Sequence, residues 1–234
     1  MIDPYDERAA AELVFTSSKF CDVRLSTRSM PAESGEFTGD WCEAFAVSEH
    51  VMALSVGDIC GHGAEKYDAM VAMRALIHET ATLGEDPVGT LFEANRFLRR
   101  YDLDELATAI FGLFDVRTRM LTFANAGHPP PILATNTAAR FIEFSDAALP
   151  LGVRDEWSGS MRSIRITDAS LLVIYTDGVS ERKRTPLRGE EDLLNAAVFS
   201  HHFPTLPSAT VIGTRLSLLG SNLDNAAILT VRTP

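Results

Sequence analysis

Apolar residues recur along most of this chain as short runs separated by polar and glycine-rich turns, a pattern typical of β-strands. The segments 41–47 and 51–56 are joined by Ser48-Glu-His50 and predict a hairpin. Other short connections also favour antiparallel pairing. The remaining predicted strands are 20–29, 107–114, 121–125, 132–134, 141–144, 161–166, 170–175 and 226–231.

The hydrophobic period changes to that of a helix after Ala64, where apolar positions recur every three or four residues. This predicts helices over 64–83 and 87–100, with Asp86-Pro87 as the start of the second. Further helices are expected at 190–202 and 208–221. We interpret residues 1–19 as a short N-terminal extension or helix. The whole chain, 1–234, is therefore expected to be one α+β domain.

Composition and charge narrow the function classes. The chain has 46% apolar and 23% charged residues, which is ordinary for a globular protein. Its net charge of -11 argues against nucleic acid or an anionic membrane as partner. The three cysteines form no C-x-x-C pair and fit neither a disulfide framework nor a zinc site. With no signal-like or membrane-length apolar run, we expect a cytoplasmic protein.

Four aspartates occupy similar places at predicted strand ends. They are Asp40, Asp58, Asp177 and Asp224. In an antiparallel hairpin the positions of Asp40 and Asp58 are adjacent, so their carboxylates would face one site. Hard oxygen ligands without nearby histidine or cysteine suit Mg²⁺ or Mn²⁺. Two such ions about 4 Å apart share a carboxylate in sites that activate water for attack on phosphorus.

Other interpretations of the same residues are simpler or have less support. An aspartate in a glycine-rich turn is most often a turn residue. The glycines at 57, 61 and 63 match neither a dinucleotide fingerprint nor a P-loop. The chain contains no G-x-S-x-G hydrolase elbow. From spacing alone, the metal site and the turn interpretation both stay open.

Six segments in this order resemble the bacterial serine/threonine phosphatases of the PPM (PP2C-like) superfamily, in the SpoIIE/RsbU-type branch. They are Thr38-Gly-Asp40, Gly57-Asp-Ile-Cys-Gly-His-Gly63, Asn125-Ala-Gly-His-Pro-Pro-Pro131, Leu149-Pro-Leu-Gly152, Tyr175-Thr-Asp-Gly-Val-Ser-Glu181 and Leu223-Asp-Asn225. Each segment alone is weak evidence for the resemblance. The ordered set, which spans about residues 20 to 232, is specific to this family.

The resemblance implies a two-layer antiparallel β-sandwich flanked by helices (α-β-β-α), with two divalent cations, Mn²⁺ or Mg²⁺, at one edge. Asp58 would bridge both ions, and Asp177 and Asp224 would bind one of them. Asp40 would serve the other ion directly or through water, and the backbone carbonyl of Ile59 would be a further ligand. These four aspartates would thus be the catalytic residues.

The function implied is that of a metal-dependent phosphoprotein phosphatase acting on phosphoserine or phosphothreonine, with no nucleic acid or membrane partner. In this branch the substrate is typically a STAS-type anti-sigma-factor antagonist, in signalling of the stress-response kind. Two departures from the family pattern are Thr38 in the first motif and Ala227 in the last, and neither removes a carboxylate. The alternative is a catalytically weak phosphatase-like module that binds a regulatory partner; a metal-independent scaffold would not need four acids at strand ends.

Overall fold

The structure is a computed structural model of the chain. It describes residues 11–17, 20–30, 39–61, 63–100, 105–144, 148–180, 186–216 and 225–234. For 11–17, 20–30 and 186–187 it describes the backbone.

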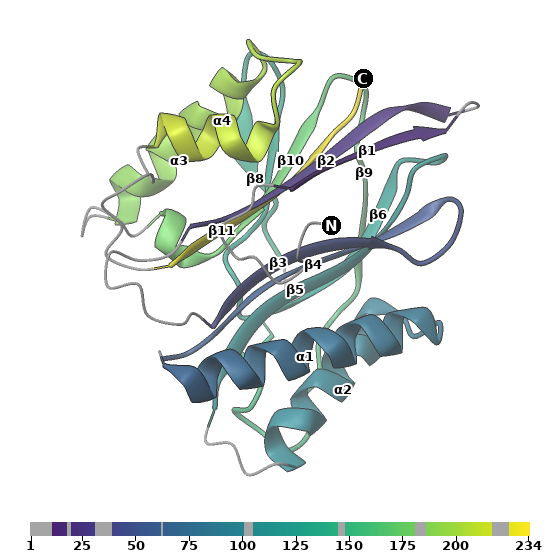
Figure 1. The fold of residues 1–234 in the computed structure, drawn as a ribbon, viewed down its shortest axis with the longest axis vertical. Coiled ribbons are helices and arrows are strands. Elements are labelled where there is room, and N and C mark those ends of the chain that lie inside the picture. The colour runs from purple at the N-terminus through teal and green to yellow at the C-terminus, as the bar shows by residue number, and fades with distance from the viewer. Residues whose placement is uncertain are drawn as a thin grey trace.

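Two antiparallel sheets form the centre of the molecule (Figure 1). The first has the strand order β1-β2-β11-β10-β7-β8 and the second β3-β4-β5-β6-β9. The strands of the first sheet are β1 (Ala11–Ser17), β2 (Phe20–Met30), β7 (Ile132–Ala134), β8 (Ala139–Phe141), β10 (Leu171–Tyr175) and β11 (Ala226–Arg232). Those of the second are β3 (Asp40–Ala46), β4 (Val51–Ile59), β5 (Ala107–Asp115), β6 (Met120–Ala126) and β9 (Arg162–Arg165).

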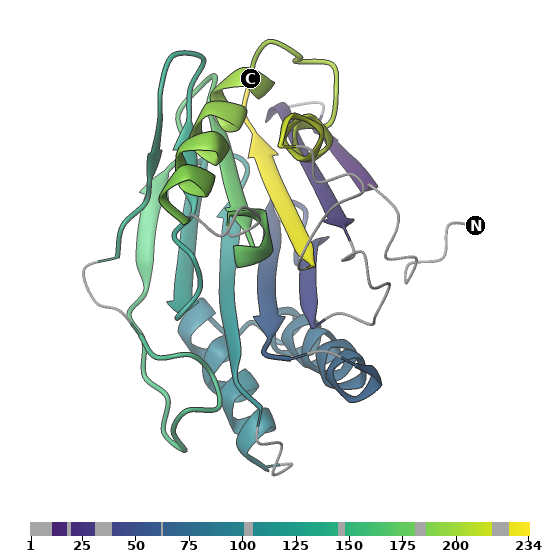
Figure 2. The same ribbon diagram turned by 90° about the vertical axis from the view of Figure 1, so that its left-hand side faces the viewer.

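Helices cover the outer face of each sheet, so the fold has four layers, as Figures 1 and 2 show. Helices α1 (Ala64–Thr82) and α2 (Pro87–Arg100) pack on the β3–β9 sheet, and α3 (Pro186–Ser200) and α4 (Ser208–Arg215) on the other. A short 3₁₀ helix, η1 (Asp177–Val179), follows β10. This is the predicted α-β-β-α sandwich.

Each interface between layers has its own apolar cluster. The cluster between the sheets includes Leu54, Phe114 and Leu229, all fully buried. Alternate residues of the same strands point outward to the helices, as β-pleating requires; Ala53, for example, belongs to the cluster under α1 and α2. All five residues of β10 are buried, because the other sheet covers one face of this strand and helices cover the other. A strand buried on both faces has a nearly continuous apolar sequence.

The predicted elements are largely confirmed, with two corrections. The segment 11–17 is a strand paired with β2, so a helix there is wrong. Its run Leu-Val-Phe-Thr favours extended structure, and the β2 edge provides a partner. The strand expected at 141–144 lies instead at Ala139–Phe141, since it pairs with β7 through a short turn.

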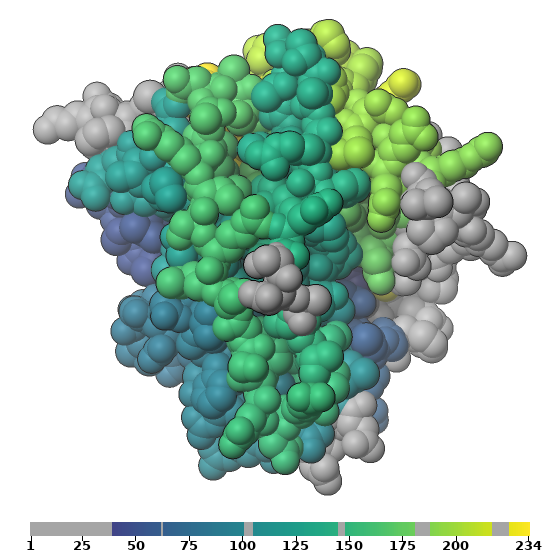
Figure 3. Space-filling model, turned by 180° about the vertical axis from the view of Figure 1, so that it is seen from behind, coloured from purple at the N-terminus to yellow at the C-terminus, as the bar shows by residue number. Residues whose placement is uncertain are grey.

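Residues 148–161, which precede β9, lie on the back of the molecule, the face that Figure 3 shows. Trp157 belongs to the apolar cluster under α1 and α2. The Asn95 amide of α2 donates to the backbone oxygens of Arg154 and Asp155 at 3.0 and 3.2 Å. These contacts fasten the segment to the helix layer. None of the described helices is long and apolar enough to cross a membrane.

Candidate metal centre

Asp40 and Asp58 lie directly opposite each other where β3 begins and β4 nears its end. Their neighbours fix this register. Trp41 pairs with Gly57, and a side chain at position 57 would collide with the Trp41 ring. The Trp41 indole also donates to Ser55 Oγ at 2.8 Å. A shift of one residue would turn this indole away from its buried place and would separate the two carboxylates.

Strand alternation directs the Trp41 indole toward the helix layer and Asp40 toward the opposite sheet. There the Thr176 hydroxyl, just after β10, donates to Asp40 Oδ2 at 2.6 Å. The same hydroxyl accepts from the Ala227 backbone N–H of β11 at 2.9 Å. Thr176 thus connects Asp40 to two strands of the other sheet.

Asp40 has an unusual protonation equilibrium because it is only 8% exposed and faces other acids. Burial raises its pKa well above the ordinary value, and the negative charge and hydrogen bond of Asp58 raise the pKa further. The Thr176 hydrogen bond lowers the pKa and so opposes this rise in part. Without a cation, protonation of the Asp40–Asp58 pair is therefore favoured, and a bound cation would compete with that proton.

The Ile59 carbonyl, the expected backbone ligand, lies beside Gly39. A Cβ at position 39 would stand 2.3 Å from the Ile59 oxygen, so a glycine is needed for this close approach. The Ile59 amide in turn donates to the Gly39 oxygen at 3.2 Å. The Gly-Asp pair of the first motif therefore places a carboxylate and leaves room for a neighbouring carbonyl oxygen.

Asp177 begins η1 and is exposed. Its charge raises the pKa of both Asp40 and the Cys60 thiol, which places it at the same end of the sandwich. Gly178 packs so tightly on β11 that a Cβ there would lie 1.8 Å from the Asn225 oxygen. Asp224 lies outside the described residues, one position before Asn225, and its role as a ligand stays a prediction.

The donor set fits a hard divalent cation. Asp40, Asp58 and the Ile59 carbonyl supply oxygen only, and the clustered negative charge needs a cation for both acids to ionise. Among the described residues, no group of three or more His, Cys, Asp or Glu side chains is close enough together to hold a metal ion. Ligation by Asp177, and the number of ions, therefore stay proposals.

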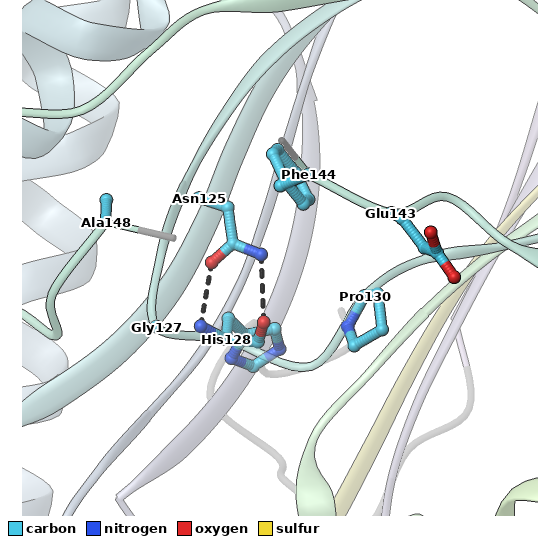
Figure 4. Close-up of a pocket in the computed structure, with 7 residues that line it drawn as sticks. All are labelled: Asn125, Gly127, His128, Pro130, Glu143, Phe144 and Ala148. Atoms are coloured by element: carbon cyan, nitrogen blue, oxygen red, sulfur yellow. Dashed lines mark hydrogen bonds between the residues drawn. The ribbon is translucent and has the colours of Figure 1, made fainter. Parts of the chain in front are cut away.

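His128 has a structural place next to this centre. The Asn125 side chain makes two hydrogen bonds to the His128 backbone (Figure 4). Its oxygen accepts from the His128 N–H at 2.7 Å, and its amide nitrogen donates to the His128 carbonyl at 2.8 Å. The ring Nδ1 is 2.9 Å from the Thr108 hydroxyl, and Thr108 is the β5 partner of Asp58. Burial lowers the His128 pKa to about 3, which an interaction with the Tyr175 backbone offsets only in part. The imidazole is therefore neutral at physiological pH.

A cavity of about 400 Å³ borders the same turn, and its lining is shown in Figure 4. Asn125, His128 and Phe144 are among the residues that line it, whereas Asp40, Asp58 and Asp177 do not. The cavity is thus separate from the carboxylate pair.

Sequence patterns did not single out three polar residues that shape the site. Thr176 precedes Asp177 in the fifth motif. Its position between a buried strand and an acid is the one sequence feature that could have indicated its role. Glu105 and Lys66 form an ion pair beside the loop after β4. No local pattern marks either residue, since they meet only through the fold.

The comparisons with known proteins agree with this architecture. The model of the family Stage II sporulation protein E (SpoIIE) matches residues 48–234. The chain therefore belongs to the SpoIIE family, and its fold is that of the SpoIIE/RsbU-type PP2C phosphatases.

A relative with a stated activity is phosphoserine phosphatase RsbP of Bacillus subtilis (strain 168). It is 27% identical over 153 residues, which are 63% of this chain and 38% of RsbP. The chain thus matches well under half of that relative's length.

Solved structures share the fold over nearly all of the chain. The RsbU and RsbW domains of a Mycobacterium tuberculosis protein have a TM-score of 0.78 at 25% identity, covering 92% of this chain and 60% of that one. The PP2C phosphatase domain of Bacillus subtilis SpoIIE has a TM-score of 0.72 at 18% identity, covering 89% and 63%. RsbX, solved in complex with magnesium, has a TM-score of 0.70 at 16% identity, covering 96% and 100%.

Proposed function

We propose that this chain is a metal-dependent serine/threonine protein phosphatase. The observation that carries the proposal is the buried Asp40 carboxyl directly opposite Asp58, in a chain of the SpoIIE family. Two divalent cations, Mn²⁺ or Mg²⁺, would be held by Asp40, Asp58, the Ile59 carbonyl, Asp177 and Asp224. Bound there, they would supply the Lewis acidity that polarises a phosphoryl oxygen and makes water a nucleophile near neutral pH.

The chain's own residues have separable tasks in this mechanism. Asp58, on the interior strand β4, is the acid we assign as the shared ligand, because it lies between Asp40 on the edge strand β3 and the Thr108 position on β5. Thr176 fixes the orientation of Asp40 through its 2.6 Å hydrogen bond. Water would attack phosphorus in line with the serine or threonine oxygen, which leaves with a proton while inorganic phosphate is released.

The substrate we propose is a phosphorylated protein of the STAS type, an anti-sigma-factor antagonist. Three features support a protein substrate. RsbP is named a phosphoserine phosphatase, and the M. tuberculosis structure combines RsbU and RsbW domains in one chain. The glycine-rich loop after β4 also lacks the spacing of a nucleotide-binding loop.

The test is release of inorganic phosphate from a phosphoserine STAS-domain protein with Mn²⁺, with Mg²⁺ and with EDTA. Turnover with either ion and none in EDTA is expected. Nucleoside triphosphates serve as the competing substrate and should be hydrolysed poorly. Tight binding of the phosphoprotein without turnover at saturating Mn²⁺ would instead favour the alternative, a module that binds a regulatory partner.

A further inference from the structure

Lys66, in the first turn of α1, forms an ion pair with Glu105, in the segment that leads into β5. The Glu105 side chain is 6% exposed and the Lys66 side chain 25% exposed. The second carboxylate oxygen of Glu105, Oε2, is buried without a hydrogen-bond partner. Removing Lys66 would leave an uncompensated charge in the interior, which is costly. The pair therefore ties the start of α1 firmly to the approach of β5.

The loop that follows Asp58 lies beside this ion pair. The stem of Lys66 runs past Gly61, where a Cβ would stand 3.1 Å from Lys66 Cε. The Cys60 amide donates to the Leu106 carbonyl at 2.8 Å, one residue after Glu105. Ile59 pairs with the first residue of β5. The loop is thus held on one side by the Lys66 stem and on the other by the backbone next to Glu105.

Position also links this pair to the carboxylate site. Glu105 lies one residue before Leu106, whose carbonyl accepts from the Cys60 amide two residues after Asp58. Without the ammonium group, Glu105 would add one more negative charge that is not a ligand. With it, the net charge of the pair is zero, and the Lys66 stem lies against Gly61 in the loop that follows Asp58 and Ile59.

We propose that Lys66 and Glu105 are positioning residues that set the affinity of the site for its divalent cation by fixing the segment 58–61, which comprises the last two residues of β4 and the start of the loop after it. The inference rests on the proposed function for the identity of the site. We call this ion pair the Lys66–Glu105 clamp. It acts on the backbone position of the Ile59 carbonyl and on the Asp58 side chain, and it touches neither substrate nor the reacting atoms. Its loss should weaken metal binding and leave turnover at saturating metal nearly unchanged.

The first measurement uses the metal-free protein. Amide hydrogen exchange at Cys60 reports directly on the bond to Leu106. Lys66→Met should speed this exchange, whereas exchange in β10 should stay as in the wild type. Unchanged protection at Cys60 in Lys66→Met would overturn the clamp.

The second measurement is calorimetric titration with Mn²⁺ alone, beside the Mn²⁺ dependence of phosphate release. Lys66→Met and Glu105→Gln should each weaken Mn²⁺ binding by about 10- to 100-fold, as for residues that orient metal ligands. Lys66→Arg keeps the charge and should restore most of the affinity. Arg117→Met, which removes a surface partner of Asp115 at the other end of β5, is the matched control and should change nothing.

A double variant separates positioning from stability. Lys66→Met with Glu105→Met replaces a buried ion pair by apolar side chains, a change that often preserves stability. Weak Mn²⁺ binding by a double variant of normal stability supports the clamp. Wild-type affinity in that variant would overturn it, since the pair would then act on stability alone. If wild-type protein binds Mn²⁺ in this Lys66-dependent way but never releases phosphate, the clamp stands and the proposed phosphatase function fails.

Discussion

Asp40 and Asp58 face each other across β3 and β4, close enough for their carboxyl groups to share a hydrogen bond. Two acids in this arrangement cannot both be ionised in isolation, because burial and mutual repulsion disfavour the second charge. The relationship is unfavourable for a purely structural pair and suitable for binding a cation.

Asp58→Asn should abolish most activity. The substitution preserves size but removes the charge shared between the proposed ions, so both should bind more weakly. Turnover should fall by about 100-fold or more, equivalent to about 3 kcal/mol of transition-state stabilisation. Mn²⁺ stoichiometry by calorimetry, beside phosphate release, tests this. Normal turnover with two bound ions would show that the centre lies elsewhere.

Asp40→Asn should stabilise the metal-free protein at neutral pH. The pKa of Asp40 is raised above its ordinary value of 3.8, so the folded state retains a proton that the unfolded state releases. Stability from this group is fully present below pH 3.8 and is lost as the pH rises through the folded pKa. Urea unfolding from pH 4 to 8 should show a smaller decline in the variant. With saturating Mn²⁺ the order should reverse, because the wild type gains more from binding.

Thr176→Val should destabilise the fold and the site together. Valine has a similar shape but lacks the hydroxyl that donates to Asp40 Oδ2 and accepts from the Ala227 N–H. The expected loss is about 1–3 kcal/mol in the free energy of unfolding. Mn²⁺ affinity should also fall, since Asp40 loses its orientation. Thr176→Ser keeps the hydroxyl and is the control; equal losses in both variants would contradict the role of the hydrogen bonds.

Gly178→Ala should separate the turn that carries Asp177 from β11. The new methyl group would stand 1.8 Å from the Asn225 oxygen, so the backbone must move. We expect weaker Mn²⁺ binding as well as lower thermal stability. Gly84→Ala, at a φ of 93° after α1, strains the backbone far from the site and is the comparison. Loss of stability in both variants, with Mn²⁺ affinity lost only in Gly178→Ala, is the expected result.

His128 should remain neutral throughout the pH range of activity. Its pKa is about 3 in the folded protein against an ordinary value of 6.5, so its contribution to stability is present above pH 6.5 and is lost as the pH falls toward 3. The loss amounts to about 1.4 kcal/mol per pH unit. The stability difference between wild type and His128→Gln should therefore shrink between pH 6.5 and 4. A histidine proton resonance of His128 titrating near pH 6.5 would refute this.

The sequence by itself predicted most of the elements and supplied the proposed ligand set. Alternation and helical periodicity located β4, α1 and α2, because these segments are amphipathic or fully apolar. The hairpin predicted over 41–56 brings Asp40 near Asp58, since antiparallel strands place such ends side by side.

Only the tertiary structure decided which distant side chains complete the site. Thr176 lies 136 residues from Asp40 in sequence, and their hydrogen bond exists because two separate sheets pack face to face. Lys66 meets Glu105 across 39 residues, where no local pattern could pair them. The strand at 11–17 likewise formed because a neighbouring edge offered hydrogen bonds that an isolated segment lacks. Hydrophobic periodicity reflects the local secondary structure of each segment, whereas these contacts depend on how the sheets and helices pack against one another.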